Sequence, residues 1–140
     1  MNVEVVVMLK QLVKDLAAEF ELTLPAEVKG TYTFEVAPTV IVTFIELQPG
    51  VLIDAKIEEC PKEKREDLFI SIMQANMLGQ GTGGSSIGLD KDEKYLTLSL
   101  ALPYEINYRA FKESLEEFVN YLLYWRTQIQ KAKEEAQRLI

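Results

Sequence analysis

The chain has 140 residues, the size of one ordinary domain, and 48% of them are hydrophobic, which is enough to bury a core. Its 22 acidic residues outnumber the 15 basic ones, and a surface with a net charge of −7 repels nucleic acid and anionic membranes. A single cysteine excludes an internal disulfide, and we find no signal peptide and no apolar run long enough for membrane insertion. We therefore expect one cytoplasmic domain over residues 1–140, with no nucleic-acid partner.

A helix is predicted for residues 3–20, because Leu9, Val13, Leu16 and Phe20 recur at three- and four-residue spacings.

Three strands are predicted next. Residues 31–36 alternate apolar and polar side chains, residues 40–47 are apolar on both faces, and residues 51–57 alternate again. The turns Ala37-Pro38-Thr39 and Gln48-Pro49-Gly50 join them. Connections this short require antiparallel pairing.

A second helix is predicted from Pro61 to about Leu78, with proline in its first turn. A glycine-rich run ends it, and two strands follow at residues 86–89 and 95–102. A long final helix carries an apolar stripe, which we expect to face the core: Phe111, Leu115, Phe118, Leu122, Trp125 and Ile129. The order α-βββ-α-ββ-α predicts the α+β class, an antiparallel sheet with helices packed against it.

No residue pattern predicts catalysis, a cofactor or a metal ion. Histidine is absent, and Cys60 lies beside Glu58 and Glu59, whose charges oppose thiolate formation. The carboxylates of residues 90–93 lack the glycine and the twelfth-position glutamate of a calcium loop, so we interpret them as a hairpin turn. The glycines of residues 79–84 follow a helix instead of opening one, which favours a helix cap and a close-approach loop over a nucleotide site.

The chain has more apolar faces than one α+β layer buries. Both faces of residues 40–47, the first helix and the methionines of the second helix contribute to this excess. Such faces form either a tight three-layer core or an interface, for which methionine-rich surfaces are suited.

Residues 68–126 resemble the second half of the class I type III secretion chaperones, the CesT-like (Tir chaperone) family. The matching features are an apolar helix ending in Ala75-Asn76, a glycine-containing loop, two strands, and a proline, Pro103, before a long amphipathic helix. The element order, the length and the acidic charge match over essentially the whole chain.

The resemblance implies a homodimer that binds secreted effector proteins as extended chains and catalyses no reaction. It implies cargo contacts through the first helix and the neighbouring strands, at Leu9, Val13, Leu16, Phe20, Phe34, Val40, Val42 and Phe44. It implies a dimer interface through the second helix, at Phe69, Met73 and Met77. On this assignment, Val42→Asp abolishes cargo binding and leaves the fold largely intact.

Two alternatives remain open at this point. A regulatory protein of the same fold would sequester a transcription factor or another chaperone. A small-molecule binder or enzyme would need convergent polar groups in a pocket, which the absence of histidine and of a reactive cysteine disfavours.

Overall fold

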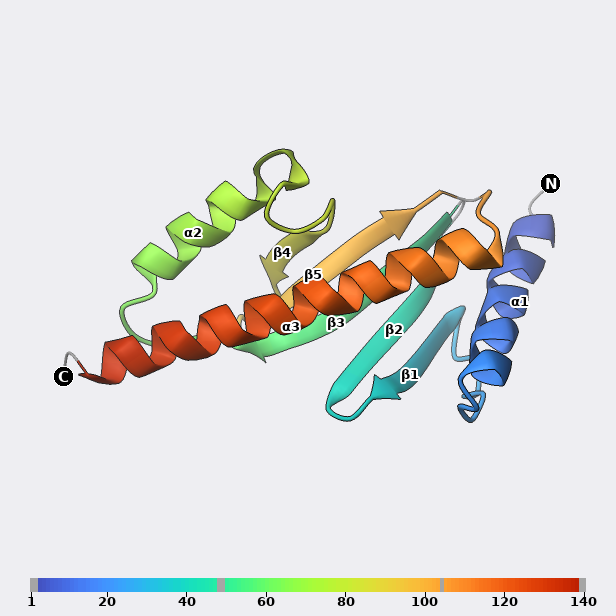
Figure 1. Ribbon diagram of the computed structural model, residues 1–140, viewed down its shortest axis with the longest axis horizontal. Coiled ribbons are helices and arrows are strands. Elements are labelled where there is room, and N and C mark those ends of the chain that lie inside the picture. Colours follow the sequence, from blue (N-terminus) through green and yellow to red (C-terminus); the bar gives the residue numbers. More distant parts are fainter. Residues whose placement is uncertain (1–2, 48–49, 104, 139–140) are drawn as a thin grey trace. The chain divides into compact units, whose positions relative to one another are not determined.

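The computed structural model describes residues 3–47, 50–103 and 105–138 (Figure 1). The elements are α1 (Val3–Glu19), β1 (Thr31–Ala37), β2 (Val40–Leu47), β3 (Gly50–Glu59), α2 (Glu66–Asn76), a 3-10 turn η1 (Met77–Gly79), β4 (Ser86–Leu89), β5 (Tyr95–Leu102) and α3 (Tyr108–Arg138). The strands form one antiparallel five-stranded sheet in the order β1-β2-β3-β5-β4. The predicted class and element order are therefore confirmed, while the predicted turn at Gln48-Pro49 lies outside the described residues.

The start of the second helix was predicted wrongly. Helix α2 begins at Glu66, and Pro61 lies, buried, in the connection that follows β3. Lys64 has a φ of 52°, a left-handed conformation that no helical residue adopts, so the helix starts only after it. The preference of proline for the first turn of a helix is only local. Here Pro61 instead follows the end of β3, which runs to Glu59.

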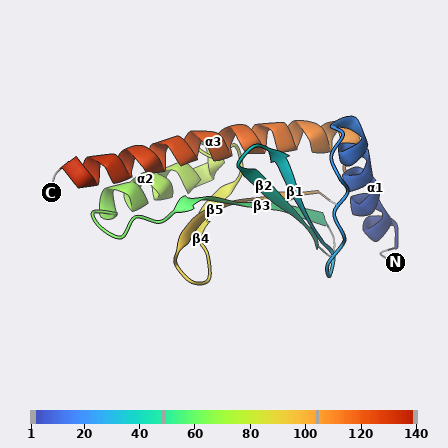
Figure 2. The ribbon, with the colours of Figure 1, turned by 90° about the horizontal axis from the view of Figure 1, so that it is seen from below.

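The chain divides into two compact units. The first comprises Met1–Ala55 and Leu100–Glu116. In it, α1 lies beside the first turns of α3 in every view, and the β1–β2 hairpin is seen below these turns in Figure 2. Phe44 joins the hairpin to α3, because its ring lies 5.8 Å from that of Phe34 and 5.3 Å from that of Phe111. Aromatic pairs at these distances stabilise a core beyond their buried area.

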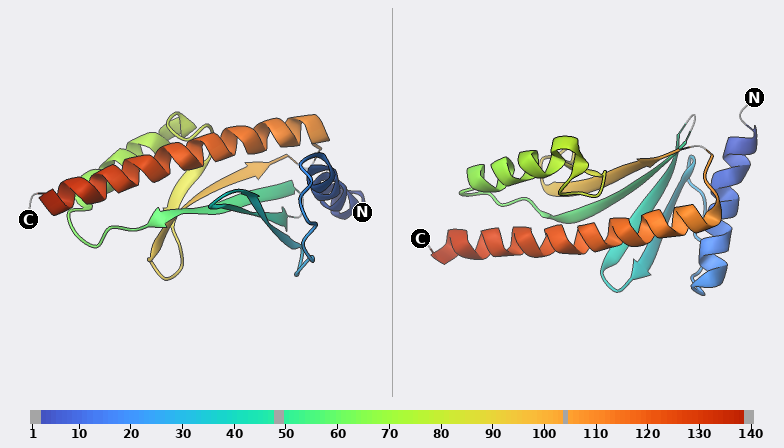
Figure 3. Two further views of the ribbon diagram at one scale, coloured as in Figure 1. Left: turned by 60° about the horizontal axis from the view of Figure 1, so that its bottom comes forward. Right: turned by 45° about the horizontal axis from the view of Figure 1, so that its top comes forward.

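The second unit comprises Lys56–Ser99 and Glu117–Ile140, and it includes α2, β4 and most of α3 (Figure 3). The apolar stripe predicted on the final helix is buried from Phe111 to Ile129, as expected for a core-facing helix. A polar row on the same helix binds the end of β3. The Arg126 Nε–H donates to the Ile57 carbonyl at 2.9 Å, and Gln130 and Lys133 bind the Glu58 carboxylate.

Candidate interaction surfaces

The residues predicted to contact cargo all belong to the first unit, and most of them are buried in it. Seven of them are at most 3% exposed: Leu9, Val13, Leu16, Phe34, Val40, Val42 and Phe44. Phe20, at the end of α1, is 47% exposed and is the one that lies on the surface of the isolated chain. The apolar periodicity identified which residues of each element share a face, and these faces are buried. The cargo assignment of the seven remains a prediction that requires their exposure.

The opposite face of the β1–β3 sheet presents its own apolar side chains. Ile41 of β2 is 56% exposed, and Ile45 and Leu52, paired across β2 and β3, are half-buried. The connection between α1 and β1 adds two more exposed apolar residues, Leu24 at 43% and Val28 at 63%. Sequence reasoning missed these positions, although the two-sided apolar character of residues 40–47 was the signal for Ile41.

Strand β1 is an end strand of the sheet, and the described residues leave part of its outer edge open. The Glu46 N–H donates to the Gly30 carbonyl at 2.9 Å, so alternate positions from Thr31 onward direct their backbone groups away from β2. Val28 exchanges two hydrogen bonds with Thr31 at 3.0 and 3.1 Å and so occupies the first of these positions. Thr33 and Glu35 present their N–H and C=O groups at the open edge, where an extended chain can pair.

Of the residues predicted to form the dimer interface, Phe69 and Met73 lie on α2 of the second unit, and Met77 follows at its C-terminal end, in η1. Met73 is 70% exposed, Met77 is 65% exposed, and Phe69 is half-buried with the Arg65 guanidinium 5.4 Å from its ring. Ile70, which is 53% exposed, stands one turn before Met73. These side chains give α2 an apolar, methionine-rich exposed side, while Leu68 and Ile72 are buried.

The glycine-rich loop packs closely against α3, as predicted for a close-approach loop. A Cβ at Gly83 would collide with the Tyr121 ring, and a Cβ at Gly81 would lie 2.7 Å from the Cβ of Ala75. The Trp125 indole N–H donates to the Gly81 carbonyl at 2.9 Å. A hollow of about 300 Å³ lies beside this contact, lined by Gly81, Asn120, Tyr121 and Tyr124.

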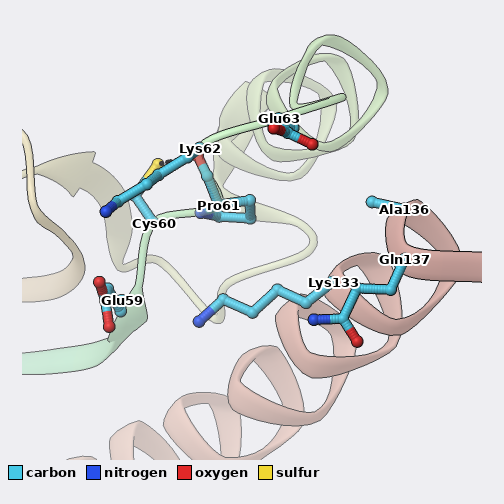
Figure 4. A pocket seen from close by; sticks show the side chains of 8 residues that line it. All are labelled: Glu59, Cys60, Pro61, Lys62, Glu63, Lys133, Ala136 and Gln137. Carbon is cyan, nitrogen blue, oxygen red and sulfur yellow. Dashed lines mark hydrogen bonds between the residues drawn. The ribbon is translucent and has the colours of Figure 1, made fainter. Parts of the chain in front are cut away.

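A second hollow, of about 280 Å³, lies between the end of β3 and the last turns of α3 (Figure 4). Figure 4 shows Lys133, Ala136 and Gln137 of α3 on one side and residues 59–63 on the other. The Cys60 thiol is buried and donates to the Pro61 carbonyl at 3.5 Å, and the Lys133 ammonium lies 3.5 Å from Glu58. Both polar groups thus have partners within the chain.

The carboxylates of residues 90–93 form a hairpin turn. An oxygen of Asp90 accepts hydrogen bonds from the N–H groups of Lys94 and Tyr95, at 2.9 and 3.2 Å. Among the described residues, no group of three or more acidic, cysteine or histidine side chains is placed to hold a metal ion. Within the same part of the chain, no helix combines the length and apolarity needed to cross a membrane.

Among the described residues, the carboxylates of Glu19 and Glu58 have lowered pKa values. Hydrogen bonds from the Lys112 ammonium and the Tyr108 hydroxyl hold the pKa of Glu19 below its ordinary value. Burial raises the pKa of Tyr108, and its bond to Glu19 raises it further. Burial alone would raise the pKa of Glu58, but the Glu59 N–H, Gln130 and Lys133 outweigh it and lower that pKa. Glu19 thus ties the end of α1 to α3, and Glu58 ties the end of β3 to α3.

Comparison with known proteins identifies the chain's relatives. Residues 11–126 match the profile of the Tir chaperone protein (CesT) family. The Chlamydia pneumoniae protein CPj0713/CpB0740 is 24% identical over 131 residues, which span 91% of this chain and 100% of that protein.

Solved structures share the fold at low identity. The HopA1–SchA chaperone–effector complex contains a chain that is 16% identical, with a TM-score of 0.67 over 90% of this chain and 95% of the other. The heterodimeric ExoU–SpcU complex, from the type III secretion system of Pseudomonas aeruginosa, gives 16% identity and a TM-score of 0.63 over 82% and 92% of the two chains. YbjN, a putative transcription regulator from E. coli, is 12% identical, with a TM-score of 0.62 over 85% of this chain and 92% of the other.

Proposed function

Because the chain belongs to the Tir chaperone protein (CesT) family, we propose that it is a cytoplasmic type III secretion chaperone that binds an extended N-terminal segment of an effector protein. It keeps this segment soluble and competent for secretion, and it catalyses no reaction. The observation that carries the proposal is the family match over residues 11–126. The chaperone–effector complexes among the structures of this fold support it.

The open edge of β1 supports a mode of binding. An effector segment pairs with the backbone of Thr33 and Glu35, and its apolar side chains contact Val28 and Ile41 beside that edge. Backbone hydrogen bonds tolerate many sequences, while the apolar contacts select among them. Burial of apolar surface, worth roughly 25 cal/mol per Å², offsets the entropy that the effector loses on ordering.

The proposal includes a homodimer. The exposed side of α2, with Ile70, Met73 and Met77, is the surface that a second copy would cover. Exposed apolar patches of this kind usually mark interfaces, and closed two-fold symmetry is the commonest arrangement.

A regulatory role is the second candidate, because a putative transcription regulator shares the fold at similar coverage. The two candidates differ in the fate of the partner. An effector leaves the cell through the secretion system, whereas the target of a regulator remains inside. The partner's export therefore decides between them.

The test uses the tagged chain expressed in its host, with the co-purified partner identified and its secretion measured with and without the chain. We expect an exported partner whose N-terminal segment is protected from protease in the complex. Retention of the partner in the cell would instead establish the regulatory role.

Two variants at one position test the binding mode. Thr33→Pro removes an N–H that points to the open edge and leaves the β2 ladder intact. We expect it to lower partner capture at least tenfold, whereas Thr33→Ala, which keeps the N–H, captures normally. Equal capture by both variants would remove the β1 edge from the binding surface.

A further inference from the structure

The two end strands of the sheet differ in how their outer edges are satisfied. At the β4 end, the side-chain amide of Asn76 makes two hydrogen bonds to one residue, Ile87. Its Nδ2–H donates to the Ile87 carbonyl at 2.9 Å, and its Oδ1 accepts the Ile87 N–H at 2.9 Å. This is the pair of bonds that a residue of a neighbouring antiparallel strand would make.

The register of β4 shows that these bonds lie on its outer side. The Asp90 N–H donates to the Tyr95 carbonyl at 2.9 Å, so the Asp90–Tyr95 pair is hydrogen bonded. Counting back along β4, the backbone groups of Gly88 point toward β5, and those of Leu89 and Ile87 point away from it. Asn76 therefore binds the outward-facing backbone groups of Ile87. Of the two residues of β4 that face outward, only Leu89, the last residue of the strand, has no bond from Asn76.

We propose that Asn76 is a positioning residue that closes the β4 edge of the sheet. Closure prevents a second copy of this chain from pairing with β4, and it confines strand addition to β1, where the adjacent positions Thr33 and Glu35 are open. The statement about β1 rests on the proposed function, whereas the closure of β4 does not. Unprotected strand edges are templates for association between chains.

The chemistry of the side chain explains why asparagine stands at the end of α2. A primary amide carries one acceptor and two donors, so it satisfies both an N–H and a C=O. Aspartate in the same place accepts the Ile87 N–H but presents a carboxylate to the Ile87 carbonyl. Alanine satisfies neither group and leaves the edge open.

Hydrogen exchange of the Ile87 amide, measured by NMR on the full chain, tests the closure. We expect this amide to be protected in the wild type although it faces the end of the sheet, and to exchange at least tenfold faster in Asn76→Ala. In Asn76→Asp, which keeps the acceptor, protection is expected to remain. Unchanged exchange in Asn76→Ala would overturn the proposal.

Light-scattering mass separates edge closure from simple structural support. Asn76→Ala is expected to form species larger than the wild type through β4–β4 pairing, while Asn76→Asp, whose charge repels an incoming strand, keeps the wild-type mass. If both variants gain mass equally, or neither does, Asn76 does not close the edge. Guanidinium denaturation of each variant verifies that it is folded, and neither readout requires an effector.

Discussion

Glu19 connects the end of α1 to the start of α3 within the first unit. Its carboxylate accepts hydrogen bonds from the Tyr108 hydroxyl and the Lys112 ammonium, and the Lys112 Nζ also lies 5.4 Å from the centre of the Phe20 ring. Tyr108 and Lys112 of α3 thus meet at the acidic side chain of the last residue of α1. Phe20 is the exposed apolar residue of this group.

The lowered pKa of Glu19 predicts a pH dependence. A carboxyl whose pKa falls on folding adds stability above its unfolded pKa, close to the ordinary 4.5, and this stability is lost as pH falls through the lowered folded value. We expect Glu19→Gln to be less stable than the wild type at neutral pH, with a difference that closes in acid.

Urea denaturation of both chains from about pH 7 to pH 3 measures this difference. Glu58 titrates in the same range in both chains, so its contribution cancels in the comparison. A difference between the two chains that does not change with pH would contradict the assignment of the shift to Glu19.

At the scale of the element, β2 has one buried and one accessible face. Val42 is 0% exposed, while its neighbour Ile41 is 56% exposed and pairs with Glu35 of β1. Val42→Asp was expected from the sequence to be a surface change that spares the fold. The structure contradicts that expectation, because an unpaired carboxylate would be buried among apolar side chains.

We therefore predict opposite outcomes for neighbouring substitutions. Val42→Asp should destabilise the fold by about 3 kcal/mol or more, whereas Ile41→Lys, opposite Glu35, should change stability by less than about 1 kcal/mol. Denaturation midpoints measure both effects. If Ile41→Lys also captures less effector while remaining folded, the accessible face of β2 belongs to the binding surface. If this variant captures as much effector as the wild type, Ile41 does not belong to the binding surface.

The sequence predicts elements well where side-chain periodicity decides the structure. The stripe from Phe111 to Ile129 identified α3 and its buried side, and the alternation of Tyr32 and Phe34 identified the inner face of β1. Periodicity says which residues share a face but not which faces are covered, so it does not reveal that strand residues predicted to contact cargo are buried in the isolated chain. The bond between Asn76 and Ile87 joins residues eleven positions apart, and no local pattern predicts it.

At the scale of the whole molecule, the exposed side of α2 predicts a dimer. Met73 is the most exposed of its apolar side chains, so Met73→Lys should give a folded chain with the mass of a monomer, 16.0 kDa. Met73→Leu keeps the apolar surface and should remain dimeric. Light scattering measures both masses. A wild-type mass of 16.0 kDa would contradict the homodimer, and a dimeric Met73→Lys would place the interface elsewhere.

The single tryptophan of the chain has a spectroscopic consequence. Trp125 is buried in the second unit, with its indole N–H bound to the glycine-rich loop, so its fluorescence reports the unfolding of that unit alone. Far-UV circular dichroism reports the helices and strands of both units. If residues 1–140 form one cooperative domain, the two signals change at the same denaturant concentration. Transitions at different concentrations would show that the first unit folds and unfolds on its own.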